Sequence, residues 1–314
     1  MMGAFSERSG NPPADMVYPC PMDSLRSAAA GDWLKPLIDT QWHDMHAVVP
    51  RGFPAYARIF HPAWRDRPED THTWHGHGLP ARGGLEQQVV GWSDVAQAFG
   101  RQMHALAQFH RLVGPETPRL GPLDAEGWRY SSPEEGNLAP GILANAAAHL
   151  CRHTTTPDRG VTAIWDGWGG LASSAGYMQL TLRADGASWT SPEPTETGPG
   201  SGLLPADVVN GEKLELPGRS YFLFDTAPRI YVAADWVNEA PWHHMPESPQ
   251  SPGILWPSDH SWVLVSEIDF DSTVVGGSRE LIGALVQDPA IEAMVLQEGA
   301  DLGWDADIPN RPLV

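Results

Sequence analysis

Residues 256–296 read WPSDHSWVLVSEIDFDSTVVGGSRELIGALVQDPAIEAMVL and decide the fold class. The apolar run Trp262–Ile268 predicts a buried strand, and Gly276-Gly277 predicts a tight turn. Ser278 is a typical helix N-cap, and the apolar residues after it recur at helical spacing. A second β-rich run follows at Ile291–Leu296. The order strand, glycine turn, capped helix and strand predicts a C-terminal unit of an α+β fold.

The rest of the chain adds strands and helices in an irregular order. Apolar periodicity predicts a helix over Gly141–Arg152, and Ser93 is the expected N-cap of a shorter helix. Further strands are expected at Ala55–Phe60, Val161–Asp166 and Tyr221–Phe224. Because these strands follow one another without a regular intervening helix, we expect an α+β fold with a mainly antiparallel sheet and a few packed helices.

The domain organisation follows from stretches that lack periodicity. Residues 1–30 mix Ser, Pro, Gly, Asn and Ala, which predicts a flexible N-terminal tail. Residues 31–314 are expected to form a single α+β domain. Gly-, Pro- and polar-rich stretches predict surface loops at about 65–88, 184–202 and 239–257.

Composition excludes several classes of protein. The net charge of −19 disfavours binding to nucleic acid, which requires a basic surface. Apolar residues make up 41% of the 314 residues, which is typical of a globular protein. A membrane span needs roughly 20 consecutive apolar residues, and the sequence predicts none. Two cysteines and an N-terminus without an apolar secretory signal lead us to expect a cytosolic protein.

Several short motifs are spread over residues 153–278. They are His153–Pro157, Trp165–Gly169, Leu216–Arg219, Tyr221, Leu223-Phe224, Trp256-Pro257, Asp259, Trp262, Glu267–Asp269, Ser272-Thr273 and Val275–Ser278. With these motifs the chain resembles an uncharacterised family of actinobacterial proteins, over residues 46 to 296. The resemblance implies no activity, because none is known for that family.

Histidine and tryptophan motifs supply the first two candidate sites. His75 and His77, one residue apart on an extended chain, point to the same side and are candidate metal ligands together with His72. The alternative is a polar surface loop. Trp165-Asp166-Gly167-Trp168 places an acid between aromatic rings at a strand end, a pattern typical of small-molecule sites. The alternative is a turn in which Asp166 binds backbone and both rings pack.

The densest cluster of reactive side chains is C-terminal. If the strand continues, Glu267, Asp269 and Asp271 share one face, and three neighbouring carboxylates raise a pKa or invite a cation. Gly276-Gly277-Ser278 follows at a helix start, whose free N–H groups attract anions. The alternative is a solvated strand end with Ser278 as an ordinary N-cap.

Three functional hypotheses remain open. The leading one is a cytosolic binding or interaction protein, whose Trp-lined groove takes a protein or a small molecule. It uses Trp165, Trp168, Gly276, Gly277 and Ser278 as ligand-binding residues. The second is a metal-dependent hydrolase with Asp166, Glu267 and Asp269 as candidate catalytic residues. The third is a metal-binding protein that uses the His-rich loop. No cofactor is predicted, apart from a divalent metal under the second and third hypotheses.

Overall fold

The large sheet dominates the architecture. The computed structural model describes residues 22–76, 83–114, 120–172, 202–242 and 250–311. Among these residues, nine strands form a sheet in the order β1-β8-β6-β9-β10-β11-β2-β12, with β7 paired to β8. Every strand pair in it is antiparallel, so the expected α+β class with a mainly antiparallel sheet is confirmed. The strands of this sheet are β1 (Met22–Ser24), β2 (Ala55–Phe60), β6 (Gly160–Trp165), β7 (Leu214–Leu216), β8 (Arg219–Thr226), β9 (Ile254–Pro257), β10 (Val263–Val265), β11 (Ser272–Gly277) and β12 (Ala293–Leu296).

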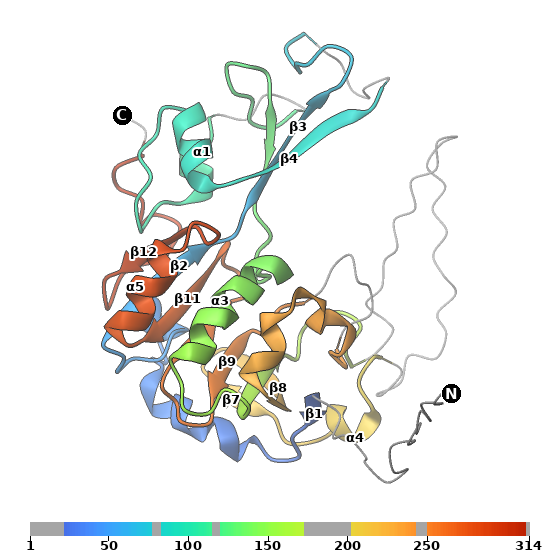
Figure 1. Ribbon diagram of the computed structural model, residues 1–314, viewed down its shortest axis with the longest axis vertical. Coiled ribbons are helices and arrows are strands. Elements are labelled where there is room, and N and C mark those ends of the chain that lie inside the picture. Colours follow the sequence, from blue (N-terminus) through green and yellow to red (C-terminus); the bar gives the residue numbers. More distant parts are fainter. Residues whose placement is uncertain (1–21, 77–82, 115–119, 173–201, 243–249, 312–314) are drawn as a thin grey trace, which may run out of the picture.

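Helices and short 3-10 turns cover both faces of the large sheet. The elements α3 and α5 lie across one face, as Figure 1 shows, and 3-10 segments η4 and η5 pack beside α3. The 3-10 segments η1 and η2 cover the opposite face. The bounds are α3 (Pro140–Arg152), α5 (Arg279–Gln287), α4 (Ala206–Val209), η1 (Ala28–Leu37), η2 (Met45–Ala47), η4 (Pro228–Val232) and η5 (Ala234–Asn238).

Strand β10 shows why the sheet is buried on both sides. Its central residue Leu264 packs into the cluster beneath α3 and α5, whereas Val263 and Val265 pack into the cluster beneath η1 and η2. Side chains alternate along a strand, so three successive apolar residues supply both cores. Continuous apolar runs of this kind mark a strand that is covered on both faces.

A smaller unit stands at one end of the molecule (Figure 1). Its sheet has the order β4-β3-β5, and it encloses an aromatic core with α1 and α2. The bounds are β3 (Ala63–Pro68), β4 (Leu85–Val90), β5 (Arg129–Ser131), α1 (Trp92–Ala98) and α2 (Phe109–Leu112).

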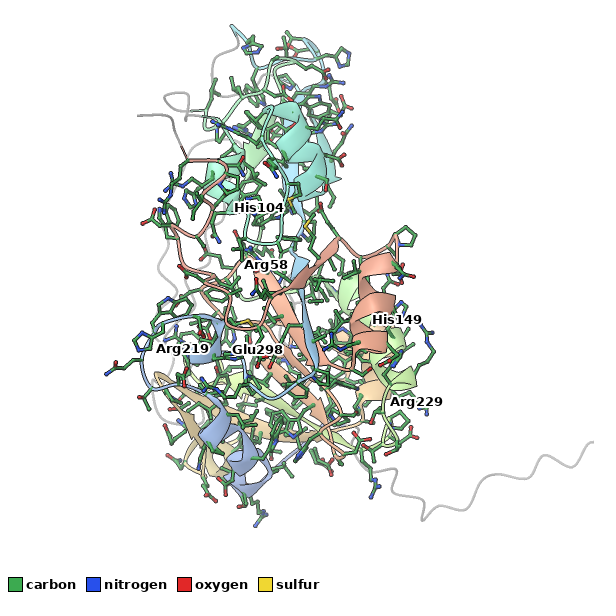
Figure 2. The ribbon with its side chains drawn as sticks, turned by 90° about the vertical axis from the view of Figure 1, so that its left-hand side faces the viewer. Arg58, His104, His149, Arg219, Arg229 and Glu298 are labelled. Atoms are coloured by element: carbon green, nitrogen blue, oxygen red, sulfur yellow. The ribbon has the colours of Figure 1, made fainter. Side chains whose placement is uncertain are left out.

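Buried polar side chains join the smaller unit to the large sheet. Arg58 of β2 is 2% exposed and lies close to His104, where the two parts meet (Figure 2). Its guanidinium donates to the Ser272 hydroxyl at 2.8 Å and to the carbonyls of Ala105 and Ala107 at 3.1 and 2.8 Å. A buried Arg without such acceptors would be costly, so these bonds fix the junction.

Three predicted boundaries differ from the structure. Residues 22–30 of the expected tail contain β1 and the start of η1, and residues 1–21 lie outside the described part. The loop expected at 65–88 contains the paired strands β3 and β4. The loop expected at 239–257 ends earlier, because β9 already pairs with β6 and β10. The loop at 184–202 lies outside the described residues, except for Gly202.

The C-terminal unit follows the predicted order with two corrections. The strand expected at Trp262–Ile268 is shorter, since β10 ends at Val265. The expected turn at Gly276-Gly277 is wrong: both glycines belong to β11, and neither has a positive φ. Among the described residues, no helix is long and apolar enough to cross a membrane.

Candidate functional site

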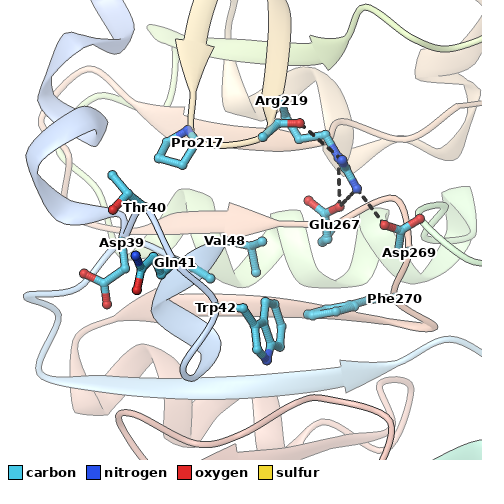
Figure 3. Close-up of a pocket in the computed structure, with 12 residues that line it drawn as sticks. Asp39, Thr40, Gln41, Trp42, Val48, Pro217, Arg219, Glu267, Asp269 and Phe270 are labelled. Carbon is cyan, nitrogen blue, oxygen red and sulfur yellow. Dashed lines mark hydrogen bonds and ion pairs between the residues drawn. The ribbon is translucent and has the colours of Figure 1, made fainter.

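A pocket of about 240 Å³ opens on the η1–η2 side of the large sheet, and we call it the Trp42 pocket. Three segments that are distant in sequence line it: the η1–η2 region, the β7–β8 turn and the β10–β11 loop. Trp42 and Phe270 form one wall, and Arg219 with its two acidic partners forms another (Figure 3). The lining residues are Asp39, Thr40, Gln41, Trp42, Ala47, Val48, Pro217, Gly218, Arg219, Glu267, Asp269 and Phe270.

The tight β7–β8 hairpin places Arg219 at the pocket. Leu216 pairs with Arg219 across the hairpin, so Pro217 and Gly218 are its two turn residues. Gly218 has a φ of 78°. Proline followed by a residue with positive φ is the pattern of a type II turn, in which glycine avoids steric strain. The turn therefore sets the first residue of β8 at the pocket edge.

Arg219 bridges two carboxylates. Its Nη2 atom donates to Glu267 Oε1 at 3.0 Å and to Asp269 Oδ2 at 2.6 Å. Glu267 is 5% exposed and Asp269 is 71% exposed, so the network runs from the interior to the surface. Burial raises the pKa of Glu267, and Arg219 offsets this only in part. The arrangement offers hydrogen-bond acceptors and donors at one edge of the pocket.

The aromatic wall is partly open to solvent. Trp42 is 46% exposed and meets Phe270 edge to face, with ring centroids 5.8 Å apart. Behind the network, the guanidinium of Arg219 lies 5.6 Å from the Trp165 ring centroid, which is within cation–π range. An exposed indole beside hydrogen-bonding groups is a suitable surface for a ligand with one apolar face and several polar groups.

The structure brings together some of the predicted site residues. Trp165, Glu267 and Asp269 all contact Arg219. Asp166 instead forms an ion pair with Lys213 at 2.9 Å and does not line the Trp42 pocket. Trp168 meets Trp165 edge to face at 5.9 Å but packs against the core on the opposite face of the sheet. The predicted pair of tryptophans is thus divided between two faces.

The expected row of three carboxylates is wrong. After β10 the chain turns, with the Phe270 N–H donating to the Glu267 carbonyl at 2.9 Å. Glu267, Asp269 and Asp271 therefore do not follow strand alternation. Asp271 pairs with Arg58 at 3.3 Å, away from the Arg219 network.

The predicted anion site at the start of α5 is already occupied by local contacts. The Ser278 hydroxyl accepts from the Leu281 N–H at 3.1 Å, which makes Ser278 the N-cap. Gly276 and Gly277 are buried in β11. These three residues therefore serve the packing and capping of α5.

The histidines of the His-rich loop have separate contacts. His75 Nε2 lies 3.0 Å from the Asp124 carbonyl, whereas His72 Nδ1 lies 3.8 Å from Glu86. His77 lies outside the described residues. Within the described ranges, no group of three or more His, Cys, Asp or Glu side chains is placed to hold a metal ion.

Sequence reasoning missed Trp42, Phe270 and Arg219 as members of one site. One local signal was present: Trp42 stands in the polar stretch Thr40-Gln41-Trp42-His43-Asp44, where an aromatic ring has no apolar neighbours to pack with. An aromatic residue in such a context is a candidate for exposure and ligand contact.

Comparison of the chain with protein-family models, with curated proteins and with solved structures finds no match. The resemblance to an actinobacterial family stays a prediction from the motifs, and the candidate function depends on the geometry of the site.

Proposed function

We propose that this protein binds a small molecule in the Trp42 pocket. The supporting observation is that an aromatic wall and a charged wall line the same pocket. The first is the Trp42–Phe270 pair, and the second is the Arg219–Glu267–Asp269 network. Small-molecule sites combine apolar rings with a few placed polar groups. The ligand class that fits is a molecule with an apolar face and several hydrogen-bonding groups. We place the protein in the cytosol, on the sequence grounds given above.

A ligand screen with two tryptophan variants tests this proposal. Sugars, amino acids and amines are added to the full chain, and the melting temperature is measured. A true ligand raises the melting temperature of the wild type by mass action on the folded state. This shift should disappear in Trp42→Ala and persist in Trp64→Ala.

Trp64 is the matched control, because it is 47% exposed against 46% for Trp42 and lies on the smaller sheet. Any ligand that stabilises both variants equally binds elsewhere. If no compound in the screen shifts the wild type, or if every shift survives in Trp42→Ala, the proposal is wrong.

A metal-dependent hydrolase is the second candidate. Its support is that Glu267 and Asp269 both lie within hydrogen-bond distance of one nitrogen of Arg219, and that burial raises the pKa of Glu267. A carboxyl group with a raised pKa can act as a general acid. The test is whether a divalent cation raises the melting temperature of the protein, as the Discussion describes.

A further inference from the structure

A second pocket adjoins the Trp42 pocket across the β10–β11 loop. It measures about 330 Å³, and we call it the Trp304 pocket. Asp269 and Phe270 line both pockets, so the two cavities meet at this loop. Sites for drug-sized ligands span roughly 300–1,000 Å³. The Trp42 pocket falls below this range and the Trp304 pocket lies at its lower limit, which suits each to a small ring and the two together to a longer ligand.

The Trp42–Phe270 pair forms the ridge between the pockets. Phe270 lines both of them. A Cβ atom on Gly303, which lines the Trp304 pocket, would lie 3.7 Å from Trp42 Nε1. The indole of Trp42 therefore reaches the boundary of the second pocket, and a ligand that passes from one pocket to the other crosses these two rings.

Trp304 provides a further aromatic surface at the far pocket. Its ring stacks on His110 with centroids 3.5 Å apart and an interplanar angle of 6°, yet Trp304 is 69% exposed. Burial lowers the pKa of His110, which favours the neutral imidazole. One face of the indole is held by His110, and the exposed remainder is oriented before any ligand arrives.

Two polar groups of the Trp304 pocket lack partners. Gln108 is 7% exposed, and its Nε2 atom has no hydrogen-bond partner among the described residues. The same holds for His110 Nε2. A buried polar atom without a partner costs about 1–3 kcal/mol, and native structures rarely leave such atoms unsatisfied. Both atoms are fully buried, so they lie behind the pocket wall and contribute no hydrogen bond to a ligand in the pocket.

Ion pairing reduces the net charge of the shared lining. Arg219 pairs with Glu267 and Asp269 in the Trp42 pocket, and Arg58 pairs with Asp271 in the Trp304 pocket. A basic peptide would have to compete with these arginines for the carboxylates. A neutral ligand rich in hydroxyl groups can use the remaining lone pairs and N–H groups without breaking an ion pair.

We propose that the two pockets together bind an oligosaccharide of at least two rings, one ring in each pocket, with the chain crossing the Trp42–Phe270 ridge. The flat apolar faces of sugar rings match the exposed indoles of Trp42 and Trp304, and their hydroxyls match the Arg219–Glu267–Asp269 network. The inference rests on the proposed function, because it names the ligand class of the Trp42 pocket.

Isothermal titration calorimetry of the full chain tests the inference. The probes are glucose, galactose and N-acetylglucosamine, together with maltose, cellobiose and chitobiose and their tri- and tetrasaccharides. We expect at least one disaccharide to bind about tenfold or more tightly than its monosaccharide, as one further aromatic contact provides. Trp304→Ala should remove this advantage, so that the disaccharide binds this variant no more tightly than the monosaccharide does. Trp42→Ala should weaken both, and Trp64→Ala neither.

Spermidine and a Gly-Arg-Gly peptide in the same assay separate the two proposals. One outcome is that no saccharide binds, while these cations bind the wild type and lose affinity in Trp42→Ala. In that case the oligosaccharide inference is overturned and the proposed small-molecule function stands. Equal affinity for mono- and disaccharides also overturns the inference. Binding of none of these probes overturns it, and a screen without any Trp42-dependent ligand overturns the proposed function as well.

Discussion

His61 Nε2 lies 2.8 Å from the hydroxyl oxygen of Thr273. His61 Nδ1 lies 2.7 Å from the Glu134 carbonyl, which can only accept, so the ring proton sits on Nδ1 and Nε2 accepts from Thr273. The Thr273 oxygen lies 2.6 Å from the Ser266 hydroxyl, which donates to it in turn. This buried chain joins the residue that follows β2 to β11 and the β10–β11 loop, and it requires a neutral imidazole.

We predict that His61 makes the protein less stable in mild acid. Burial lowers the pKa of His61 to about 4, below the ordinary value of 6.5. The unfolded chain therefore binds the proton first, and stability falls as the pH drops from 6.5 towards 4. The full loss is about 3 kcal/mol. Urea unfolding at several pH values measures it, and histidine NMR titration gives the pKa directly.

His61→Gln is the control, because glutamine keeps hydrogen bonding and does not titrate. The raised pKa values of Glu267 and Asp271 act in the opposite direction, so the comparison with this variant isolates His61. An equally steep dependence on pH in wild type and variant would contradict the prediction.

Gly277 is predicted to be needed for packing. A Cβ atom there would lie 2.7 Å from Leu281 Cδ2 and 3.3 Å from Trp262 Cβ, and both neighbours are fully buried. Gly277→Ala should destabilise the protein by about 1–3 kcal/mol through overpacking. The matched control is Gly283→Ala inside α5, where a Cβ meets nothing within 4 Å. It should stabilise by about 0.5–1 kcal/mol, and chemical denaturation measures both changes.

Arg219 is predicted to matter more for stability than Asp269. Arg219→Met leaves the buried Glu267 carboxylate without its charged donor and should cost more than about 1 kcal/mol. Asp269 is 71% exposed, so Asp269→Asn should change the free energy of unfolding by no more than about 0.5 kcal/mol. Urea unfolding at pH 7 gives both values. A larger loss in Asp269→Asn than in Arg219→Met would contradict this order.

Divalent cations decide the hydrolase hypothesis. If Glu267 and Asp269 hold magnesium, manganese or calcium, the ion should raise the melting temperature of the wild type, and Asp269→Asn should abolish the shift. The control is Asp271→Asn, since Asp271 pairs with Arg58 elsewhere. If none of the three ions shifts the wild type, the hypothesis loses its main support.

Glu292 caps α1 from a distant part of the chain, and we predict that removing its carboxylate lowers the stability of the protein. Its carboxylate accepts from the backbone N–H of Trp92 at 2.6 Å and of Ser93 at 2.7 Å, as well as from the Ser93 hydroxyl at 2.6 Å. The expectation that Ser93 itself is the N-cap is therefore wrong. Glu292→Ala should cost about 1 kcal/mol or more, and Ser93→Ala less. Unfolding of both variants at the same pH checks the order.

Regular elements with a strong local pattern were predictable. The strand at Ala55–Phe60 has the predicted bounds, and α3 begins at Pro140, one residue before the predicted start. The strands β3 and β4 were hidden because their sequences are polar. The guanidinium groups of Arg65 and Arg67 lie 4.3 and 4.0 Å from the Trp128 ring centroid, so charged side chains do the packing that apolar ones usually do.

Only part of the candidate site was predictable, because segments that are distant in sequence form it. Glu267 and Asp269 stand in a conspicuous acidic run, but their partner Arg219 and the opposite wall at Trp42 come from other segments. No local periodicity encodes which distant segments meet. The break after Val265 also depends on tertiary contacts, since the Gly136 N–H donates to the Phe270 carbonyl at 2.8 Å.

The position of β2 between β11 and β12 sets a constraint on synthesis. A ribosome makes residues 55–60 long before residues 272–296, yet β2 finds both of its neighbours only in that last segment. Until those residues leave the exit tunnel, the apolar side chains of β2 have no sheet to join, and unpaired apolar strands are prone to aggregate. The apolar side chains of β2 therefore stay without strand partners for the whole interval between synthesis of residues 55–60 and synthesis of residues 272–296.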